Sequence, residues 1–68
     1  MKNKLNQEFT AKDIIKLRKS YGLKQGDLAK ALNIKQATLS RYENGAYIPP
    51  HIHKLLNFYK KLKELQAL

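Results

Sequence analysis

The most informative stretch of the sequence is residues 25–43, QGDLAKALNIKQATLSRYE. Apolar residues at helical spacing predict one short helix over Gln25–Leu32 and a second over about Gln36–Glu43. Only residues 33–35 separate them, a turn too tight for the two helices to pack antiparallel, so we expect a steep crossing. A steep crossing brings the backbones close together, and Ala29 is the small residue that such a contact needs.

The turn and the apolar positions agree with this arrangement. Asn33 stands where the turn needs a residue that accepts positive φ, which Asn does more readily than most residues. Five apolar side chains are expected to pack between these two helices and hold them together: Leu28, Leu32, Ile34, Leu39 and Tyr42. This is the helix-turn-helix pattern, whose second helix enters the DNA major groove.

Two further helices are predicted outside this motif. Thr10 and Asp13 have the spacing of a capping box, which predicts a first helix over Thr10–Tyr21. Pro50 fits the first position of a final helix, and apolar residues then recur at steps of three and four without a breaker to Leu68. The expected fold is therefore all-α, with four helices and a long C-terminal helix.

The chain divides into a tail and one domain. Residues 1–9 are polar and basic and are expected to form a flexible tail, with a basic arm that follows DNA as the alternative. Residues 10–68 are expected to form the helix-turn-helix domain, with its motif at about 25–43 and its final helix at about 50–68. A chain of 68 residues has room for one such domain.

Charge and composition limit the function. The chain has 14 Lys and Arg against 5 Asp and Glu, a formal charge of +9, which points to a polyanion such as nucleic acid. It has no cysteine, which excludes disulfides, cysteine zinc sites and iron–sulfur clusters. It has no apolar run long enough to cross a membrane and no apolar segment after Met1, so we expect a cytoplasmic protein that needs no cofactor.

The sequence does not favour an enzyme or a metal site. Five acidic residues and three glycines supply no nucleophile–base pair, no paired carboxylates and no phosphate-binding loop. His51 and His53 would point about 200° apart on a helix, so they cannot share a metal on one face. Both are expected to be exposed.

The residues from Lys12 to Leu56 are similar to the Cro/cI-type (XRE, lambda-repressor-like) helix-turn-helix family. The similarity lies in Leu17-Arg18, Tyr21-Gly22-Leu23-Lys24-Gln25-Gly26-Asp27-Leu28-Ala29, Leu32-Asn33-Ile34, Thr38-Leu39-Ser40-Arg41-Tyr42-Glu43-Asn44-Gly45 and Pro49. The chain departs from the family at Lys24 and Lys35, where Ser or Thr commonly caps a helix, and at Gly26, where an acidic residue or Ala is usual. The resemblance implies a lambda-repressor-like fold and a DNA-binding regulator of bacterial or phage origin.

The resemblance also implies where DNA would be contacted. Gln can bond adenine, Arg can bond guanine and an Ala methyl can touch that of thymine, so we expect base contacts from the third helix at Gln36, Ala37, Ser40 and Arg41. Phosphate contacts are expected from Lys24, Gln25, Lys35, Thr38, Asn44, Ala46 and Tyr47. Gln25 is also expected to brace Gln36, and Arg18 and Glu43 to form an internal ion pair.

The expected function is a sequence-specific transcriptional repressor that binds a palindromic operator in double-stranded DNA as a homodimer. The candidate dimer residues are Tyr59, Leu62, Leu65 and Leu68, which could instead fold back on Leu5 and Phe9. Two alternatives remain open. The chain could be an antitoxin-like autoregulator that also binds a partner protein, or a protein-binding adaptor on a helix-turn-helix scaffold.

Overall fold

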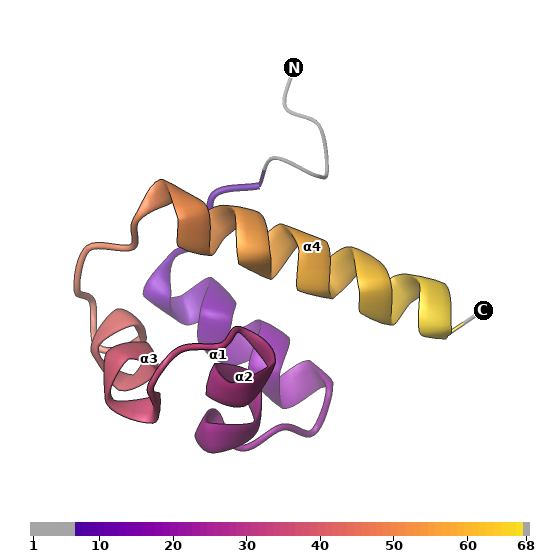
Figure 1. Cartoon of the computed structure of the whole chain (residues 1–68), viewed down its shortest axis with the longest axis horizontal. Coiled ribbons are helices and arrows are strands. Elements are labelled where there is room, and N and C mark those ends of the chain that lie inside the picture. The colour runs from indigo at the N-terminus through magenta and orange to yellow at the C-terminus, as the bar shows by residue number, and fades with distance from the viewer. Residues whose placement is uncertain (1–6, 68) are drawn as a thin grey trace.

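The computed structural model describes residues 7–67, which fold into four helices with no strand between them (Figure 1). The helices are α1 (Ala11–Ser20), α2 (Gln25–Ala31), α3 (Gln36–Glu43) and α4 (Pro50–Gln66). The predicted all-α architecture with one long final helix is confirmed. No helix in this part of the chain has the length and apolar character that a membrane span requires.

Local chemistry sets the start and end of α1. The Thr10 hydroxyl accepts a hydrogen bond from the Asp13 amide at 3.1 Å, and the Asp13 carboxylate accepts one from the Thr10 amide at 2.9 Å. The predicted capping box is therefore present, and it satisfies amides that a helix start leaves without partners. Gly22, with φ of +66°, turns the chain away just beyond the C-cap residue Tyr21.

The turn between α2 and α3 follows the sequence prediction. Asn33 has φ of +59° and is the one non-glycine residue with positive φ among those described. Lys24 and Lys35, the N-cap residues of α2 and α3, make no side-chain cap. A lysine amine has no acceptor to offer the helix amides. The Asp27 carboxylate instead accepts a hydrogen bond from the Lys24 amide at 3.0 Å, which ties down the start of α2.

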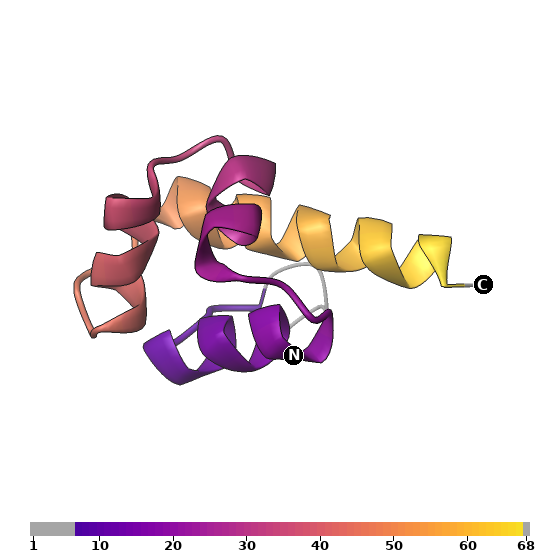
Figure 2. The same cartoon turned by 90° about the horizontal axis from the view of Figure 1, so that it is seen from below.

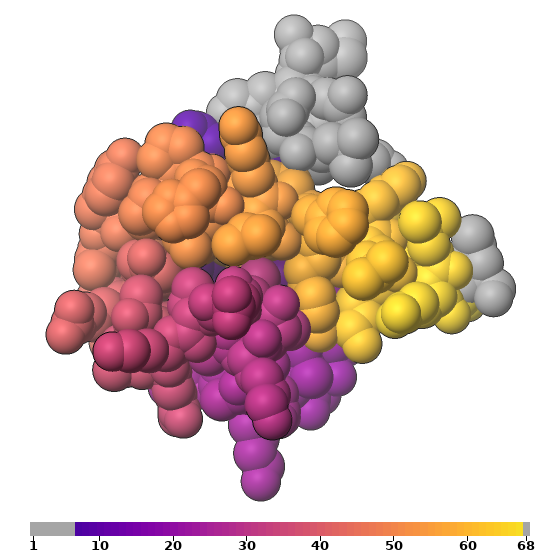
Figure 3. All heavy atoms as spheres, viewed as in Figure 1, coloured from indigo at the N-terminus to yellow at the C-terminus, as the bar shows by residue number. Residues whose placement is uncertain are grey.

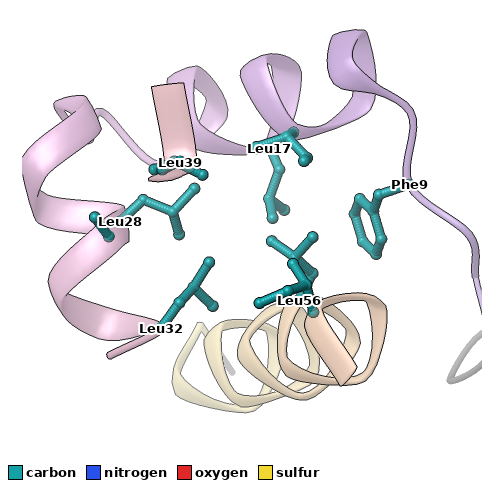
Figure 4. Packing of buried hydrophobic residues seen from close by; sticks show 9 residues of the cluster. Phe9, Leu17, Leu28, Leu32, Leu39 and Leu56 are labelled. Atoms are coloured by element: carbon teal, nitrogen blue, oxygen red, sulfur yellow. The ribbon is translucent and has the colours of Figure 1, made fainter. Parts of the chain in front are cut away.

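All four helices contribute to one apolar core (Figure 4). Its buried residues are Phe9, Ile14, Leu17, Leu28, Ala29, Leu32, Leu39, Ile52 and Leu56. Burial of each large aliphatic or aromatic side chain stabilises the fold by about 1.5–3 kcal/mol. The final helix crosses the other three, and its C-terminal turns extend beyond them (Figures 1 and 2).

Residues 7–9 are part of the domain, so the predicted tail boundary at residue 9 is wrong. The Phe9 side chain is 4% exposed and lies in the core. The amide of Gln7 donates to Asn57 Oδ1 at 3.1 Å, and Asn57 Nδ2 donates to the Gln7 carbonyl at 2.7 Å. These contacts hold residues 7–9 along α4 as a strap. The remainder of the predicted tail, residues 1–6, lies outside the described residues.

The prediction that His53 is exposed is also wrong, because its imidazole contacts the strap. Its Nδ1 accepts a hydrogen bond from the Phe9 amide at 2.9 Å, and the side chain is half-buried rather than exposed. His51 is exposed, as predicted. One turn beyond His53, the buried Asn57 side chain also donates to the His53 carbonyl at 2.8 Å. The helix thus presents two polar side chains that pair with the strap backbone.

Candidate DNA interface

Helix α3 has one buried side and one open side. Leu39 is fully buried between α3 and the rest of the core, and α3 packs against both α1 and α2. On the opposite side Gln36, Ala37 and Arg41 are exposed. Of the other candidate residues on this helix, Thr38 and Ser40 are half-buried. An element held on one side by packing and open on the other is well suited to present its side chains to a ligand.

The side chain of Gln36 lies against the start of α2. Its Nε2 donates to Gln25 Oε1 at 3.5 Å, and Gln25 Nε2 donates to Glu43 Oε1 at 3.2 Å. A Cβ atom added to Gly26 would lie 3.2 Å from Gln36 Oε1. The absence of a side chain at Gly26 therefore lets Gln36 rest there. From the sequence, Gly26 was noted only as a departure from the family, although a glycine inside so short a helix was an available signal for such a contact.

An ion pair between α1 and the end of α3 supports this contact. Arg18 Nε donates to Glu43 Oε2 at 2.9 Å, and Arg18 Nη2 donates to Glu43 Oε1 at 3.1 Å. Arg18 Nη1 also donates to the Leu23 carbonyl at 3.1 Å, in the connection to α2. Such a two-bond arrangement fixes direction as well as distance. The bracing network, Arg18–Glu43–Gln25–Gln36, thus runs from α1 to the exposed start of α3.

The C-terminal end of α3 has its own hydrogen bonds. Asn44 Nδ2 donates to the Ser40 carbonyl at 2.8 Å and lies 3.4 Å from Ser40 Oγ. Gly45, with φ of +100°, then turns the chain into the loop to α4. In this loop Ala46 is exposed and Tyr47 is 77% exposed. An uncovered tyrosine with no role in the core is available for an external contact.

Basic residues begin the two helices of the motif. Lys24 and Lys35 are the N-cap residues of α2 and α3, and both side chains are exposed. Gln25, the first residue of α2, is half-buried because its amide faces Glu43. The amide groups of a helix start carry partial positive charge. Each helix start of the motif therefore combines that charge with a lysine, next to the open side of α3.

The candidate dimer residues separate into different environments. Tyr59 packs edge-to-face on Tyr21, with ring centroids 6.1 Å apart, on the side of α4 that faces the core. Leu62 and Leu65 are exposed on α4. Leu68 lies outside the described residues. Two exposed apolar residues of the same helix, Leu55 and Phe58, were not among the predicted dimer residues, although their steps to Leu62 follow the helical period.

The described residues show no group of three or more His, Cys, Asp or Glu that could hold a metal ion. The surface beside α3 is instead made of amides, lysines, an arginine and a tyrosine. These are donors that suit phosphate oxygens and base edges. The arrangement is chemically suited to bind an anion.

A helix-turn-helix family model matches residues 14–63 of the chain. Comparisons with curated proteins and with solved structures gave no significant match. The matched range includes α2, the turn and α3, together with most of α1 and α4. With four helices in this order, the fold is lambda-repressor-like, as the sequence predicted. The chain belongs to the Cro/cI-type helix-turn-helix family of DNA-binding regulators.

Proposed function

We propose that this protein is a sequence-specific transcriptional repressor that places α3 in the DNA major groove. The observation that carries the proposal is the open side of α3, where Gln36, Ala37 and Arg41 are exposed. The Gln36 amide itself contacts Gln25 in the bracing network, so this amide is oriented before DNA arrives. Preorganised donors lose less conformational entropy on binding than free ones.

The roles of the side chains follow from their chemistry and exposure. We assign base contacts to Gln36, Ala37, Ser40 and Arg41, of which Ser40 is half-buried and the other three are exposed. We assign phosphate contacts to Lys24, Gln25, Lys35, Thr38, Asn44, Ala46 and Tyr47, which surround that side. Base contacts would select the sequence, whereas phosphate contacts would position the domain on any duplex. The charge of +9 supports the second group.

Repression would follow from occupancy of a promoter. A single domain of this size covers few base pairs, so we propose a homodimer on two half-sites, in inverted repeat, about one helical turn apart. The proposed dimer would cover the promoter and exclude polymerase. The exposed Leu62 and Leu65 of α4 support a dimer surface on that helix.

The test is selection of bound duplexes from a random DNA pool at about 0.15 M salt, at which non-specific binding is already weak. We expect enrichment of an inverted repeat. The matched variants are Gln36→Ala, which should lose the preference for the enriched sequence, and Lys16→Ala on the exposed side of α1, which should keep it. Weak binding to every duplex without enrichment would contradict a sequence-specific regulator.

A further inference from the structure

A groove, here called the strap groove, lies between the strap, the start of α4 and the loop that joins α3 to α4. It consists of two adjoining hollows of about 270 Å³ and about 370 Å³, which share four lining residues: Glu8, Tyr47, Ile48 and His53. Pockets for small molecules have volumes of roughly 300–1,000 Å³, so the groove has room for one. In Figure 3 the strap, in indigo, emerges beside the first turns of α4, in orange, which form one wall of the groove.

The polar groups that are open to a ligand in the strap groove are hydrogen-bond donors. His53 Nδ1 accepts a hydrogen bond from the Phe9 amide at 2.9 Å, so the neutral ring carries its hydrogen at Nε2. This Nε2 has no hydrogen-bond partner among the described residues. The exposed Lys54 lines the first hollow, and Lys60 Nζ lies 3.2 Å from Gln7 Oε1 at the edge of the same hollow. Such donors suit a ligand that carries a carboxylate.

The charge around the groove also favours an anion. The Glu8 carboxylate lines both hollows, but it already has an interaction partner. Against this one carboxylate stand the ammonium groups of Lys54 and Lys60. The formal charge of +9 on the whole chain adds to the positive field at the surface. An anion would therefore be attracted to the first hollow despite Glu8.

The apolar side chains of the groove come from the loop and the first residue of α4. Tyr47 is 77% exposed, and Ile48 and Pro50 line the first hollow beside it. Aromatic rings pair favourably with other flat rings, either stacked with an offset or edge to face. Together with the donors, these side chains describe a ligand with a flat apolar ring and a carboxylate.

We propose that the strap groove binds a small aromatic carboxylate that weakens DNA binding, and this regulatory part rests on the proposed repressor function. The carboxylate would accept hydrogen bonds from His53 Nε2 and Lys54, and the ring would lie on Tyr47. The bound ring would hold the Tyr47 side chain at the groove, although the same side chain is assigned to a phosphate of DNA. Ligand and DNA would thus compete for Tyr47, and each would lower the affinity for the other by the same factor.

Benzoate is the probe for the site because it is a flat ring with one carboxylate. Nuclear magnetic resonance of the full chain should show saturable shifts of the Tyr47, Ile48 and Phe9 amides with benzoate, weaker binding of uncharged benzamide and none of benzylamine. Lys54→Gln should weaken benzoate binding about two- to fivefold, the contribution of an exposed ion pair. Lys61→Gln is exposed on the same helix outside the groove and is the matched control, with wild-type affinity.

Two results would overturn the site. Equal loss of benzoate binding in Lys54→Gln and Lys61→Gln would mean that benzoate responds only to the overall charge. Binding of benzylamine as tight as that of benzoate would show that the groove does not select an anion. Shifts that do not saturate, or that lie away from the groove, would likewise mean that no such site exists.

DNA binding separates the site from the function that it would regulate. At constant ionic strength, saturating benzoate should weaken wild-type binding to the selected duplex about fivefold or more, a typical coupling between two sites. The same benzoate concentration should leave the DNA affinity of Tyr47→Ala unchanged, and thermal unfolding at the wild-type temperature would show that this variant folds. Benzoate in the groove with unchanged wild-type DNA affinity would overturn the competition. Benzoate binding by a protein that enriches no duplex would contradict the proposed repressor and leave the binding site standing.

Discussion

The Glu43 carboxylate receives two hydrogen bonds from the Arg18 guanidinium, at 2.9 Å and 3.1 Å, and this pair joins α1 to the last residue of α3. The Glu43 side chain is 6% exposed and that of Arg18 is 17% exposed. The pair is therefore largely removed from water. It also supplies the acceptor for Gln25, so the stability of the fold and the position of Gln36 depend on the same carboxylate.

The first prediction concerns this pair. Arg18→Ala should lower the free energy of unfolding by about 3–5 kcal/mol, because it leaves the Glu43 carboxylate buried without its partner. Urea unfolding followed by circular dichroism measures the change. Lys16→Ala, which removes an exposed charge from the same helix, is the control and should change stability by less than about 0.5 kcal/mol. A similarly small effect of Arg18→Ala would mean that the pair contributes little.

The second prediction concerns Gly26. Gly26→Ala should stabilise α2 by up to about 1 kcal/mol, because alanine is the better helix former. The new methyl group would also displace the Gln36 side chain, which lies 3.2 Å from its position. We therefore expect higher stability together with weaker binding to the selected duplex. In a Gln36→Ala background the effect on binding should vanish, and an equal loss there would show that Gly26 acts through another contact.

The third prediction concerns the strap. Phe9→Ala should lower the free energy of unfolding by about 3–5 kcal/mol, since it empties a core position. Asn57→Ala should cost about 1–3 kcal/mol, because the Gln7 amide and carbonyl lose their partner. Lys61→Ala, exposed on the same helix, is the matched control. Full stability of Phe9→Ala would place the strap outside the folded unit.

The fourth prediction concerns alkaline pH. Burial, followed by the charge of Glu64 and by Tyr59, raises the pKa of Tyr21 above its ordinary value of 10.0. The folded state therefore holds the Tyr21 proton more tightly than the unfolded state, and stability from this group is complete below pH 10 and falls as pH rises through the higher folded pKa. Tyr21→Phe should therefore reduce the loss of unfolding free energy that the wild type shows as pH rises above 10. An identical pH profile of the two proteins would contradict the shift.

The fifth prediction separates phosphate contacts from base contacts. Each phosphate contact contributes about 0.9 to the slope of log affinity against log salt concentration. Lys35→Ala should therefore reduce that slope by about 0.9 and weaken binding equally for all sequences. Fluorescence titrations at several salt concentrations, on the selected duplex and on a scrambled one, measure both quantities. A selective loss on the selected duplex would assign Lys35 to base recognition.

The parts of the fold that local chemistry decides were predictable from the sequence. The Thr10–Asp13 capping box, the positive φ of Asn33 and the start of α4 at Pro50 each depend on residues within a few positions of one another. Apolar spacing within α2 and α3 likewise predicted residues that became buried, among them Leu28, Leu32 and Leu39. In these cases the interaction that forms the structure lies inside the stretch that shows the pattern.

The parts that depend on distant residues were not predictable in this way. The Phe9 amide meets His53 across 44 positions, and Gln7 meets Asn57 across 50. Nothing near Asn57 indicates that this amide turns inward, because a polar residue in α4 looks like part of the solvent side. Tyr59 stood at the same three-residue spacing as Leu62 and Leu65, but contact with Tyr21 places it on the core side. The direction of a side chain was settled by packing between helices.

We propose that the open side of α3 reads DNA sequence, and a single ratio of affinities measures that property. This is the affinity for the selected duplex divided by the affinity for a scrambled duplex of the same length, measured at about 0.15 M salt. We expect a large ratio for the wild type, and for the Gln36→Ala, Arg41→Ala double variant a ratio near one with non-specific affinity largely retained. A double variant that keeps the wild-type ratio would contradict it, because sequence would then be read elsewhere on the molecule.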